Sequence, residues 1–308
     1  MDRHPLTRRQ FLARVAGVAA ALWLPALPAR EATPLITRPI PASGERLPVI
    51  GMGSWLTFDV GSDAEALATR VEVLRTFFAR GGRVVDSSPM YGRSEQTIGH
   101  CLKQIAAAPK LFSATKVWTW GRGAGIRQME SSRELWGVER FDLMQVHNLL
   151  DWESHLPTLR EWKEAGRIRY LGVTTSHGRR HDELERLMTS EPLDFVQLTY
   201  NLLDREAEAR LLPLAAERGI AVIVNRPFQG GRLFRALGRQ PLPAWAAEYD
   251  CANWAQLFLK FVVSHPAVTV AIPATSKVAH MEENMGALRG RLPGAEGRRR
   301  MAALAAAL

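Results

Sequence analysis

Four residues that could position and protonate a carbonyl group stand at or just beyond the ends of successive apolar runs. Asp86 ends one run, Tyr91 follows it in the next loop, and Lys116 and His147 end the next two runs. Reducing a carbonyl requires a proton donor for the growing alkoxide, and a phenol with an ordinary pKa of about 10 is a sluggish one. A nearby lysine ammonium favours phenolate, so we expect Lys116 to lower the pKa of Tyr91.

The two remaining side chains would complete this set. Asp86 would compensate the buried charge of Lys116, which is otherwise costly. His147 could donate a hydrogen bond to the carbonyl oxygen and orient it. Each residue alone has an ordinary structural explanation, but four at successive strand ends favour chemistry. The scheme requires no metal, and we predict no metal site because no metal-ligand spacing is found around the cysteines and no His-rich strand ends occur.

Residues 30–308 alternate between short apolar runs and amphipathic segments, which predicts the elements that carry the four residues. Helices are predicted near 63–80, 94–106, 124–137, 153–165, 181–189, 206–218, 245–264 and 278–288. Strands are predicted at Val49–Gly53, Arg83–Asp86, Leu111–Lys116, Leu143–His147, Arg169–Val173, Phe195–Tyr200, Ala221–Asn225 and Val268–Ile272.

Eight strands alternating with eight helices are typical of a parallel α/β fold. This length favours one domain, a closed (β/α)8 or TIM barrel, whose active site lies at the carboxyl ends of the strands. A doubly wound sheet is the alternative, but its phosphate-binding turn would need a third glycine after Gly51-Met52-Gly53. Pro41 to Pro48 predict a small hairpin that caps the bottom of the barrel.

Residues 1–29 have the pattern of a bacterial export signal. Arg8 and Arg9 precede Phe11, a short apolar run extends to Leu24, and Pro-Ala-Leu-Pro-Ala ends at Ala29. This order resembles a twin-arginine signal peptide, and the apolar run is too short and too rich in alanine for a stable membrane span. We therefore expect the twin-arginine export machinery as a partner and a periplasmic location. An amphipathic N-terminal helix is the alternative.

The overall composition is that of an ordinary globular protein, with 46% hydrophobic and 23% charged residues and a net charge of +9. No basic stripe with interleaved aromatic residues occurs, so we expect no nucleic-acid partner. Cys101 and Cys251 could form one disulfide, but free buried thiols are the simpler interpretation. We expect a monomer that acts on a small molecule.

The segment Asp86-Ser-Ser-Pro-Met-Tyr91-Gly-Arg-Ser-Glu95 resembles the signature of the aldo-keto reductase superfamily. Ala-Thr-Lys116-Val-Trp and Asp142-Leu-Met-Gln-Val-His147 match its lysine and histidine segments, and the resemblance spans roughly residues 35–290. It implies an NAD(P)H-dependent oxidoreductase that reduces an aldehyde or ketone to an alcohol by hydride transfer. Tyr91 would be the general acid, Lys116 would tune its pKa, Asp86 would pair with Lys116, and His147 would orient the substrate.

The same resemblance implies a set of cofactor contacts. Gly53, Ser54 and Trp55 would border the nicotinamide, and Gln197 would hold its carboxamide. The adenosine end would meet Thr275, Ser276, Glu283 and Asn284.

Several positions depart from the family pattern. Thr174 and Thr175 replace a Ser-Asn pair, and Asn225, followed by Arg226, replaces a tyrosine that stacks on the nicotinamide. Lys277 would stand in for the usual cations at the adenosine 2′-phosphate. NADPH is therefore the expected cofactor, with NADH as the alternative.

Tryptophans just beyond the strand ends, Trp118 and Trp120, would line the substrate pocket and favour aromatic or apolar aldehydes. The departures from the family pattern also leave a second hypothesis open. A catalytically retired barrel could serve as a periplasmic ligand-binding or accessory protein.

Overall fold

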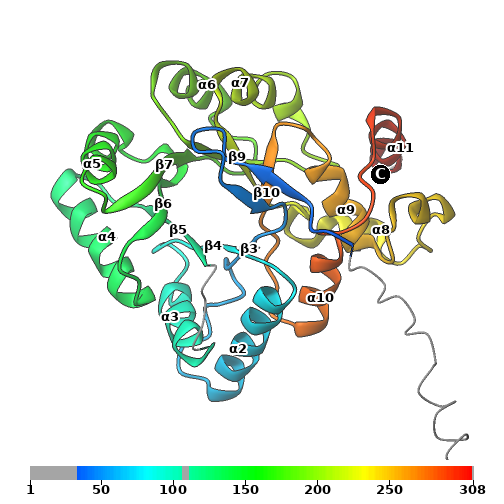
Figure 1. The fold of residues 1–308 in the computed structure, drawn as a ribbon, viewed down its shortest axis with the longest axis horizontal. Coiled ribbons are helices and arrows are strands. Elements are labelled where there is room, and N and C mark those ends of the chain that lie inside the picture. Colours follow the sequence, from blue (N-terminus) through cyan, green and yellow to red (C-terminus); the bar gives the residue numbers. More distant parts are fainter. Residues whose placement is uncertain (1–32, 106–110, 307–308) are drawn as a thin grey trace, which may run out of the picture. The chain divides into compact units, whose positions relative to one another are not determined.

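In the computed structural model, eight parallel strands surround the interior of one compact unit that begins at Leu35 (Figure 1). The structure describes residues 33–105 and 111–306, so the predicted signal at residues 1–29 lies outside the described part. The strands pair in chain order from β3 to β10, with bounds β3 Met52–Gly53, β4 Val84–Asp86, β5 Phe112–Val117, β6 Phe141–Val146, β7 Ile168–Thr174, β8 Phe195–Thr199, β9 Ala221–Asn225 and β10 Val268–Ala271.

Two isolated parallel bridges join the segment of the first barrel strand to that of the last. They link Ile50 with Ala271 and Gly53 with Ala274. The predicted (β/α)8 barrel is therefore confirmed. Among the described residues, no helix is both long enough and apolar enough to cross a membrane.

Helices cover the outside of the barrel (Figure 1). Their bounds are α2 Ala64–Ala79, α3 Ser94–Ile105, α4 Arg122–Trp136, α5 Trp152–Glu164, α6 His181–Ser190, α7 Leu211–Arg218, α8 Arg232–Leu237, α9 Trp254–Val263, α10 Val278–Gly286 and α11 Ala295–Ala306.

Two of the predicted helices are interrupted. The single helix expected over 245–264 is wrong, because Asp250 has a φ of 53° and ends a 3₁₀ turn at Ala244–Tyr249. The α9 helix then begins afresh, with the Asn253 side chain accepting a hydrogen bond from the backbone of Gln256. In the segment predicted at 206–218, a separate 3₁₀ turn at Glu206–Glu208 precedes α7.

Side chains alternate along each strand between the barrel interior and the surrounding helices. This alternation decides which side chains face the interior at the carboxyl ends of the strands, the upper end of the barrel. In β5, Ala114 belongs to the apolar cluster inside the barrel, and Lys116 follows on the same face. In β6, Leu143 belongs to that cluster, and Gln145 and His147 follow at the same spacing. An apolar lower layer therefore supports a polar layer at the carboxyl ends of the strands.

A hairpin packs against the lower, apolar end of the interior. Strand β1 (Thr37–Pro39) pairs with β2 (Arg46–Pro48) in antiparallel register. Ile40 and Leu47 are fully buried and belong to the interior cluster with the first residues of several barrel strands. The predicted hairpin is confirmed, and its first strand begins before Pro41.

Helices α3 and α4 approach closely at a glycine. A Cβ added to Gly99 would lie 1.8 Å from the backbone oxygen of Leu135. The lack of a side chain at Gly99 therefore lets α3 and α4 lie close together. At the start of α3, the buried carboxylate of Glu95 accepts hydrogen bonds from Ser132 at 2.8 Å and from Trp136 at 3.2 Å, both in α4.

Both cysteines, Cys101 and Cys251, are free and buried.

We expect Gly99→Ala to lower the free energy of unfolding by about 1–3 kcal/mol, because the added methyl group meets rigid backbone rather than a side chain that can rotate away. Gly123→Ala in α4 is the matched control, since the nearest atom to its new Cβ would lie 3.6 Å away. It should be neutral or stabilising by up to about 1 kcal/mol. Urea unfolding of both variants measures this, and equal stabilities would contradict the assigned contact.

Candidate active site

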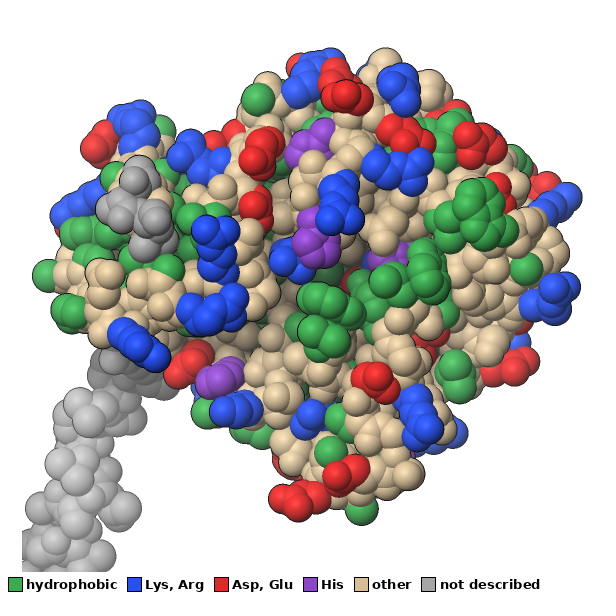
Figure 2. All heavy atoms as spheres, turned by 180° about the vertical axis from the view of Figure 1, so that it is seen from behind, with side chains coloured by type: hydrophobic (Ala, Val, Ile, Leu, Met, Phe, Trp, Pro, Cys, Tyr) green, Lys and Arg blue, Asp and Glu red, His purple; other side chains and the backbone are tan. Residues whose placement is uncertain are grey.

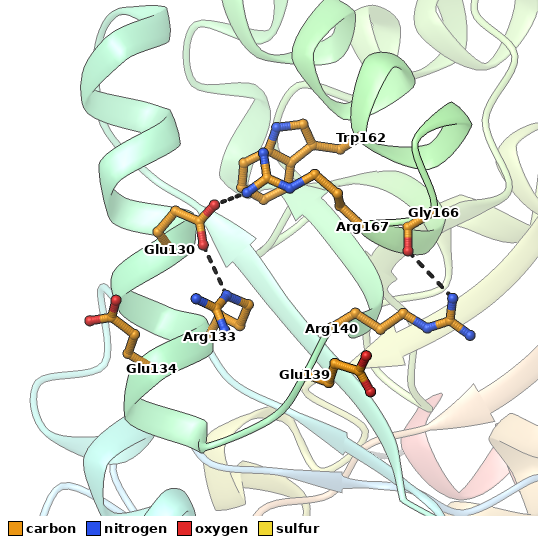
Figure 3. Close-up of a pocket in the computed structure, with 8 residues that line it drawn as sticks. All are labelled: Glu130, Arg133, Glu134, Glu139, Arg140, Trp162, Gly166 and Arg167. Atoms are coloured by element: carbon orange, nitrogen blue, oxygen red, sulfur yellow. Dashed lines mark hydrogen bonds and ion pairs between the residues drawn. The ribbon is translucent and has the colours of Figure 1, made fainter.

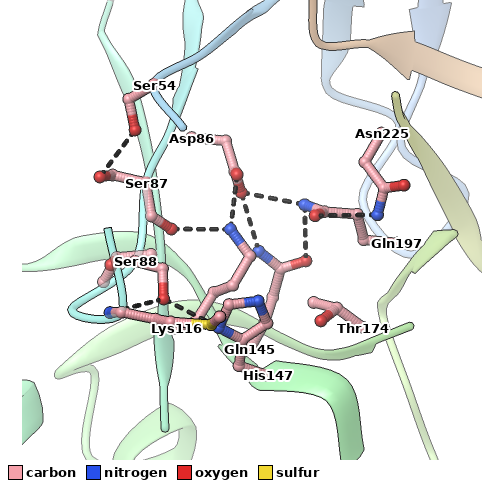
Figure 4. A network of polar contacts seen from close by, with 12 residues as sticks. Ser54, Asp86, Ser87, Ser88, Lys116, Gln145, His147, Thr174, Gln197 and Asn225 are labelled. Carbon is pink, nitrogen blue, oxygen red and sulfur yellow. Dashed lines mark hydrogen bonds and ion pairs between the residues drawn. The ribbon is translucent and has the colours of Figure 1, made fainter. Parts of the chain in front are cut away.

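A buried ion pair lies at the centre of the polar layer (Figure 4). The ammonium of Lys116, at the end of β5, donates to Asp86 Oδ2 at 2.5 Å and to the Ser87 carbonyl oxygen at 2.7 Å. Both charged side chains are buried. Parallel pairing of β4 with β5 brings these strand ends together and makes the contact local to one edge of the barrel.

The second oxygen of the Asp86 carboxylate is also engaged. Its Oδ1 accepts from Gln145 Nε2 at 3.2 Å and from Gln197 Nε2 at 3.0 Å. Three donors from three strands therefore offset the cost of burying this carboxylate. Burial lowers the pKa of Lys116, but Asp86, Tyr91 and Glu95 raise it by more, so its pKa lies above the ordinary value and the side chain is a cation.

The phenol of Tyr91 lies beside this cation, on the loop between β4 and α3. The Lys116 ammonium is 5.2 Å from the centroid of the Tyr91 ring. Burial raises the pKa of Tyr91, Lys116 lowers it by less, and the net pKa lies above the ordinary value. Lys116 therefore lowers the pKa of Tyr91 as expected, but desolvation of the phenolate raises it by more. Tyr91 holds its proton at neutral pH.

His147 follows β6 and packs edge-on against Tyr91, with ring centroids 5.6 Å apart. Burial, and then the charge of Lys116, lower the pKa of His147 to about 2. The imidazole is therefore neutral at physiological pH. Its Nδ1 lies 2.8 Å from the hydroxyl oxygen of Ser88.

These groups open onto a cavity of about 680 Å³ at the carboxyl ends of the strands, the hollow at the centre of Figure 2. Ten of the residues predicted from the sequence line it: Gly53, Ser54, Trp55, Asp86, Tyr91, His147, Thr174, Gln197, Asn225 and Arg226. Lys116 is fully buried behind them.

The other predicted residues lie beyond this lining. Thr275, Ser276 and Lys277 follow the lining residue Ala274 and lead into α10, which carries Glu283 and Asn284. Among the tryptophans, Trp118 has its ring centroid 6.5 Å from that of His147, and Trp120 is 72% exposed.

Gln197 and Asn225 form one amide chain (Figure 4). The Gln197 nitrogen is directed to Asp86, and its oxygen lies 3.5 Å from Asn225 Nδ2. Asn225 is fixed by Thr199, which donates to its oxygen at 2.6 Å, and by the Thr175 carbonyl, which accepts from its nitrogen at 2.8 Å. A side chain that the sequence aligns with a stacking tyrosine is thus part of the hydrogen-bonded wall.

Sequence reasoning did not identify two side chains that hydrogen-bond to the central four residues, Asp86, Tyr91, Lys116 and His147. Gln145 stands two positions before His147 on the same strand face, so the alternation alone could have identified it. Ser88 stands two positions after Asp86 in a loop, where no periodic pattern indicates its direction. The cavity also includes residues that were not predicted, namely Phe234 of α8 and the loop residues Leu56, Met90, His177, Arg179, Arg180 and Phe228.

A second hollow lies outside the barrel, between α4 and the turn from α5 to β7 (Figure 3). Glu130 pairs there with Arg133 and with Arg167, whose guanidinium lies 4.0 Å from the Trp162 ring centroid. These opposite charges form ion pairs with one another. The hollow is also separate from the strand ends that carry the central four residues. Within the described ranges, no cluster of three His, Cys, Asp or Glu side chains could hold a metal ion.

Known proteins resemble this chain in sequence and in fold. A methylglyoxal reductase of Escherichia coli (strain K12) is 29% identical over 257 residues, covering 81% of this chain and 88% of that protein. An NADH-specific methylglyoxal reductase of the same organism is 25% identical over 197 residues, covering 54% and 58%. The crystal structure of an aldo/keto reductase from Klebsiella pneumoniae with NADP and acetate has a TM-score of 0.73 and 24% identity, covering 85% of this chain and 92% of that one.

The family comparison covers most of the barrel. Residues 49–299 match the Aldo/keto reductase family, a range that includes every strand from β3 to β10 and all four central residues. The resemblance inferred from the sequence is confirmed, and so is the predicted enzyme class, an NAD(P)H-dependent carbonyl oxidoreductase. The chain belongs to the aldo/keto reductase family.

Proposed function

We propose that this protein reduces an aldehyde or ketone to an alcohol with NADPH, and that Tyr91 is the proton donor. The observation that carries the proposal is the buried Lys116–Asp86 pair beneath a neutral phenol and a neutral imidazole at one cavity. NADPH, when bound, supplies the hydride. A pure binding protein would have no need to bury this ion pair, because a buried pair is weak support for stability.

Each central residue has a distinct task in this scheme. A ring N–H of His147 donates to the substrate oxygen and orients it, which requires no change in the imidazole's charge. As negative charge grows on that oxygen, the Tyr91 hydroxyl transfers its proton to it. The Lys116 cation stabilises the phenolate that remains, and Asp86 keeps that cation in place.

The cavity suits a polar, anionic cofactor. Two buried polar atoms of its lining, Thr175 Oγ1 and Arg226 Nε, have no hydrogen-bond partner within the part of the chain that the structure describes. Such groups are costly unless a ligand satisfies them. Thr174, Asn225 and Arg226 would hold the nicotinamide end, and the residues that lead into α10, including Lys277, would hold the adenosine end.

The rim of the cavity indicates the substrate class. Trp55 and Met90 line the cavity and are exposed, and the exposed Trp118 has its ring centroid 6.5 Å from that of His147. A concave site bordered by exposed aromatic groups favours an aromatic or apolar carbonyl compound. Because two E. coli relatives are named methylglyoxal reductases, that small aldehyde belongs in any substrate panel.

We predict that the purified protein binds NADPH, seen as a change in nucleotide fluorescence, and reduces members of an aldehyde panel. Tyr91→Phe should lower turnover by about 10²–10⁴-fold, the usual contribution of a general acid, because only the hydroxyl is removed. Nucleotide binding should be unchanged in the variant. A parallel titration with NADH measures the cofactor preference.

Two outcomes would count against this assignment. Full turnover by Tyr91→Phe would show that another group supplies the proton. Failure of the parent protein to bind either nucleotide would favour the catalytically retired, ligand-binding barrel.

We also predict that His147 stays neutral across the working pH range. Because its pKa is lowered to about 2 in the folded protein, the unfolded chain binds the extra proton between about pH 2 and 6.5. The burial of His147 therefore does not lower the free energy of unfolding above about pH 6.5, and it lowers that free energy increasingly as the pH falls toward 2. Ring ¹⁵N shifts recorded from pH 5 to 8 should not titrate, and a midpoint near 6.5 would contradict the assigned burial.

We propose further that the chain is exported by the twin-arginine route, on the strength of Arg8 and Arg9 before Phe11. This route carries folded proteins, so a bound nucleotide could accompany the enzyme. Arg8→Lys together with Arg9→Lys should abolish a periplasmic pool, measured by fractionation of expressing bacteria. Equal amounts in the periplasm with and without the two substitutions would exclude this route.

A further inference from the structure

A fully buried hydroxyl that is not part of the cavity lining contacts the imidazole. Ser88 is fully buried on the loop after β4, and its Oγ lies 2.8 Å from His147 Nδ1 (Figure 4). The same Oγ accepts a hydrogen bond from the backbone N–H of Met90 at 3.2 Å. The loop that carries Tyr91 therefore also fixes the position of this hydroxyl.

The number of donors around Ser88 decides the direction of its hydroxyl proton. A serine hydroxyl has one hydrogen to donate and two lone pairs to accept with. The Met90 N–H occupies one lone pair of Ser88. If His147 Nδ1 also donated to Ser88, the buried hydroxyl hydrogen would need another acceptor, and within the described residues Ser88 has no other side-chain hydrogen bond. The satisfied arrangement is Ser88 Oγ–H donating to an unprotonated Nδ1.

We propose that Ser88 is a positioning residue that holds His147 in the tautomer with its proton on Nε2, so that the ring presents an N–H donor to the substrate. This inference rests on the proposed reductase function, since it assigns the source of the donor in that scheme. His147 lines the cavity, and its second nitrogen is the one not held by Ser88.

The tautomer matters because the ring cannot gain a donor by protonation. Burial, and then the charge of Lys116, keep the imidazole neutral, and a neutral ring has only one N–H. With the proton on Nδ1, the cavity side would present a lone pair to a carbonyl oxygen, and the two acceptors would repel. A fixed Nε2–H is therefore the form that can orient the carbonyl and stabilise its developing charge.

The experiment compares Ser88→Ala with Ser88→Thr in the full chain, labelled with ¹⁵N in histidine. His147 signals are identified by their loss in His147→Gln. In the parent protein, we expect Nδ1 to resonate as an unprotonated nitrogen and Nε2 as a protonated one. Ser88→Ala should move both signals toward a mixture of tautomers, and Ser88→Thr, which keeps the hydroxyl, should retain the parent pattern.

Catalysis gives the second readout. Because kcat/KM falls in proportion to the population of the donor tautomer, a mixture of tautomers in Ser88→Ala should lower kcat/KM by about 2–10-fold. NADPH affinity should not change. Ser113→Ala is the matched control, because its buried hydroxyl bonds Asp142, away from the cavity. It should leave both the tautomer and kcat/KM unchanged.

The outcomes separate this inference from the proposed function. A protonated Nδ1 in the parent protein overturns the inference whatever the activity. Reduced activity in Ser88→Ala with an unchanged tautomer also overturns it, since the effect would then be structural. A parent protein without reductase activity but with the expected tautomer would contradict the proposed function and retain the hydrogen-bond assignment.

Discussion

The buried ion pair between Lys116 and Asp86 is the constraint around which the upper end of the barrel is arranged. Each charge is removed from water, so each must be satisfied within the protein, and removal of one partner typically costs about 3–5 kcal/mol. Asp86 meets this requirement with donors from β5, β6 and β8. The polar layer therefore depends on correct pairing and register of strands on both sides of β4 and β5.

The same ion pair determines the charges of its neighbours. Lys116 opposes protonation of His147 and partly offsets the burial of Tyr91, so both neighbours are neutral while the lysine is charged. A phenol that holds its proton and an imidazole that can only donate through one nitrogen are the forms that a carbonyl requires. Burial, which is unfavourable for the ion pair, is what selects these forms.

Much of this arrangement follows from sequence. Alternation places Lys116 and His147 above the apolar residues of β5 and β6, and parallel neighbours bring their ends together, so the barrel and the grouping of the four residues were predictable. The sign of the Tyr91 pKa shift was not, because it depends on how much water is excluded. The break at Asp250 and the direction of Ser88 also escaped prediction, since both depend on loop conformations that have no periodic signal.

Asn225 shows how a departure from a family pattern can be accommodated within the same layer. Its amide is held by Thr199 and by the Thr175 carbonyl, and it lies beside the oxygen of Gln197, whose nitrogen is bound to Asp86. Replacement of an aromatic ring by this amide removes a flat surface but extends the hydrogen-bonded wall from β4 as far as β9. At this position the site therefore has a hydrogen-bonded wall where the family pattern has a flat aromatic surface, and this departure leaves the Lys116–Asp86 pair in place.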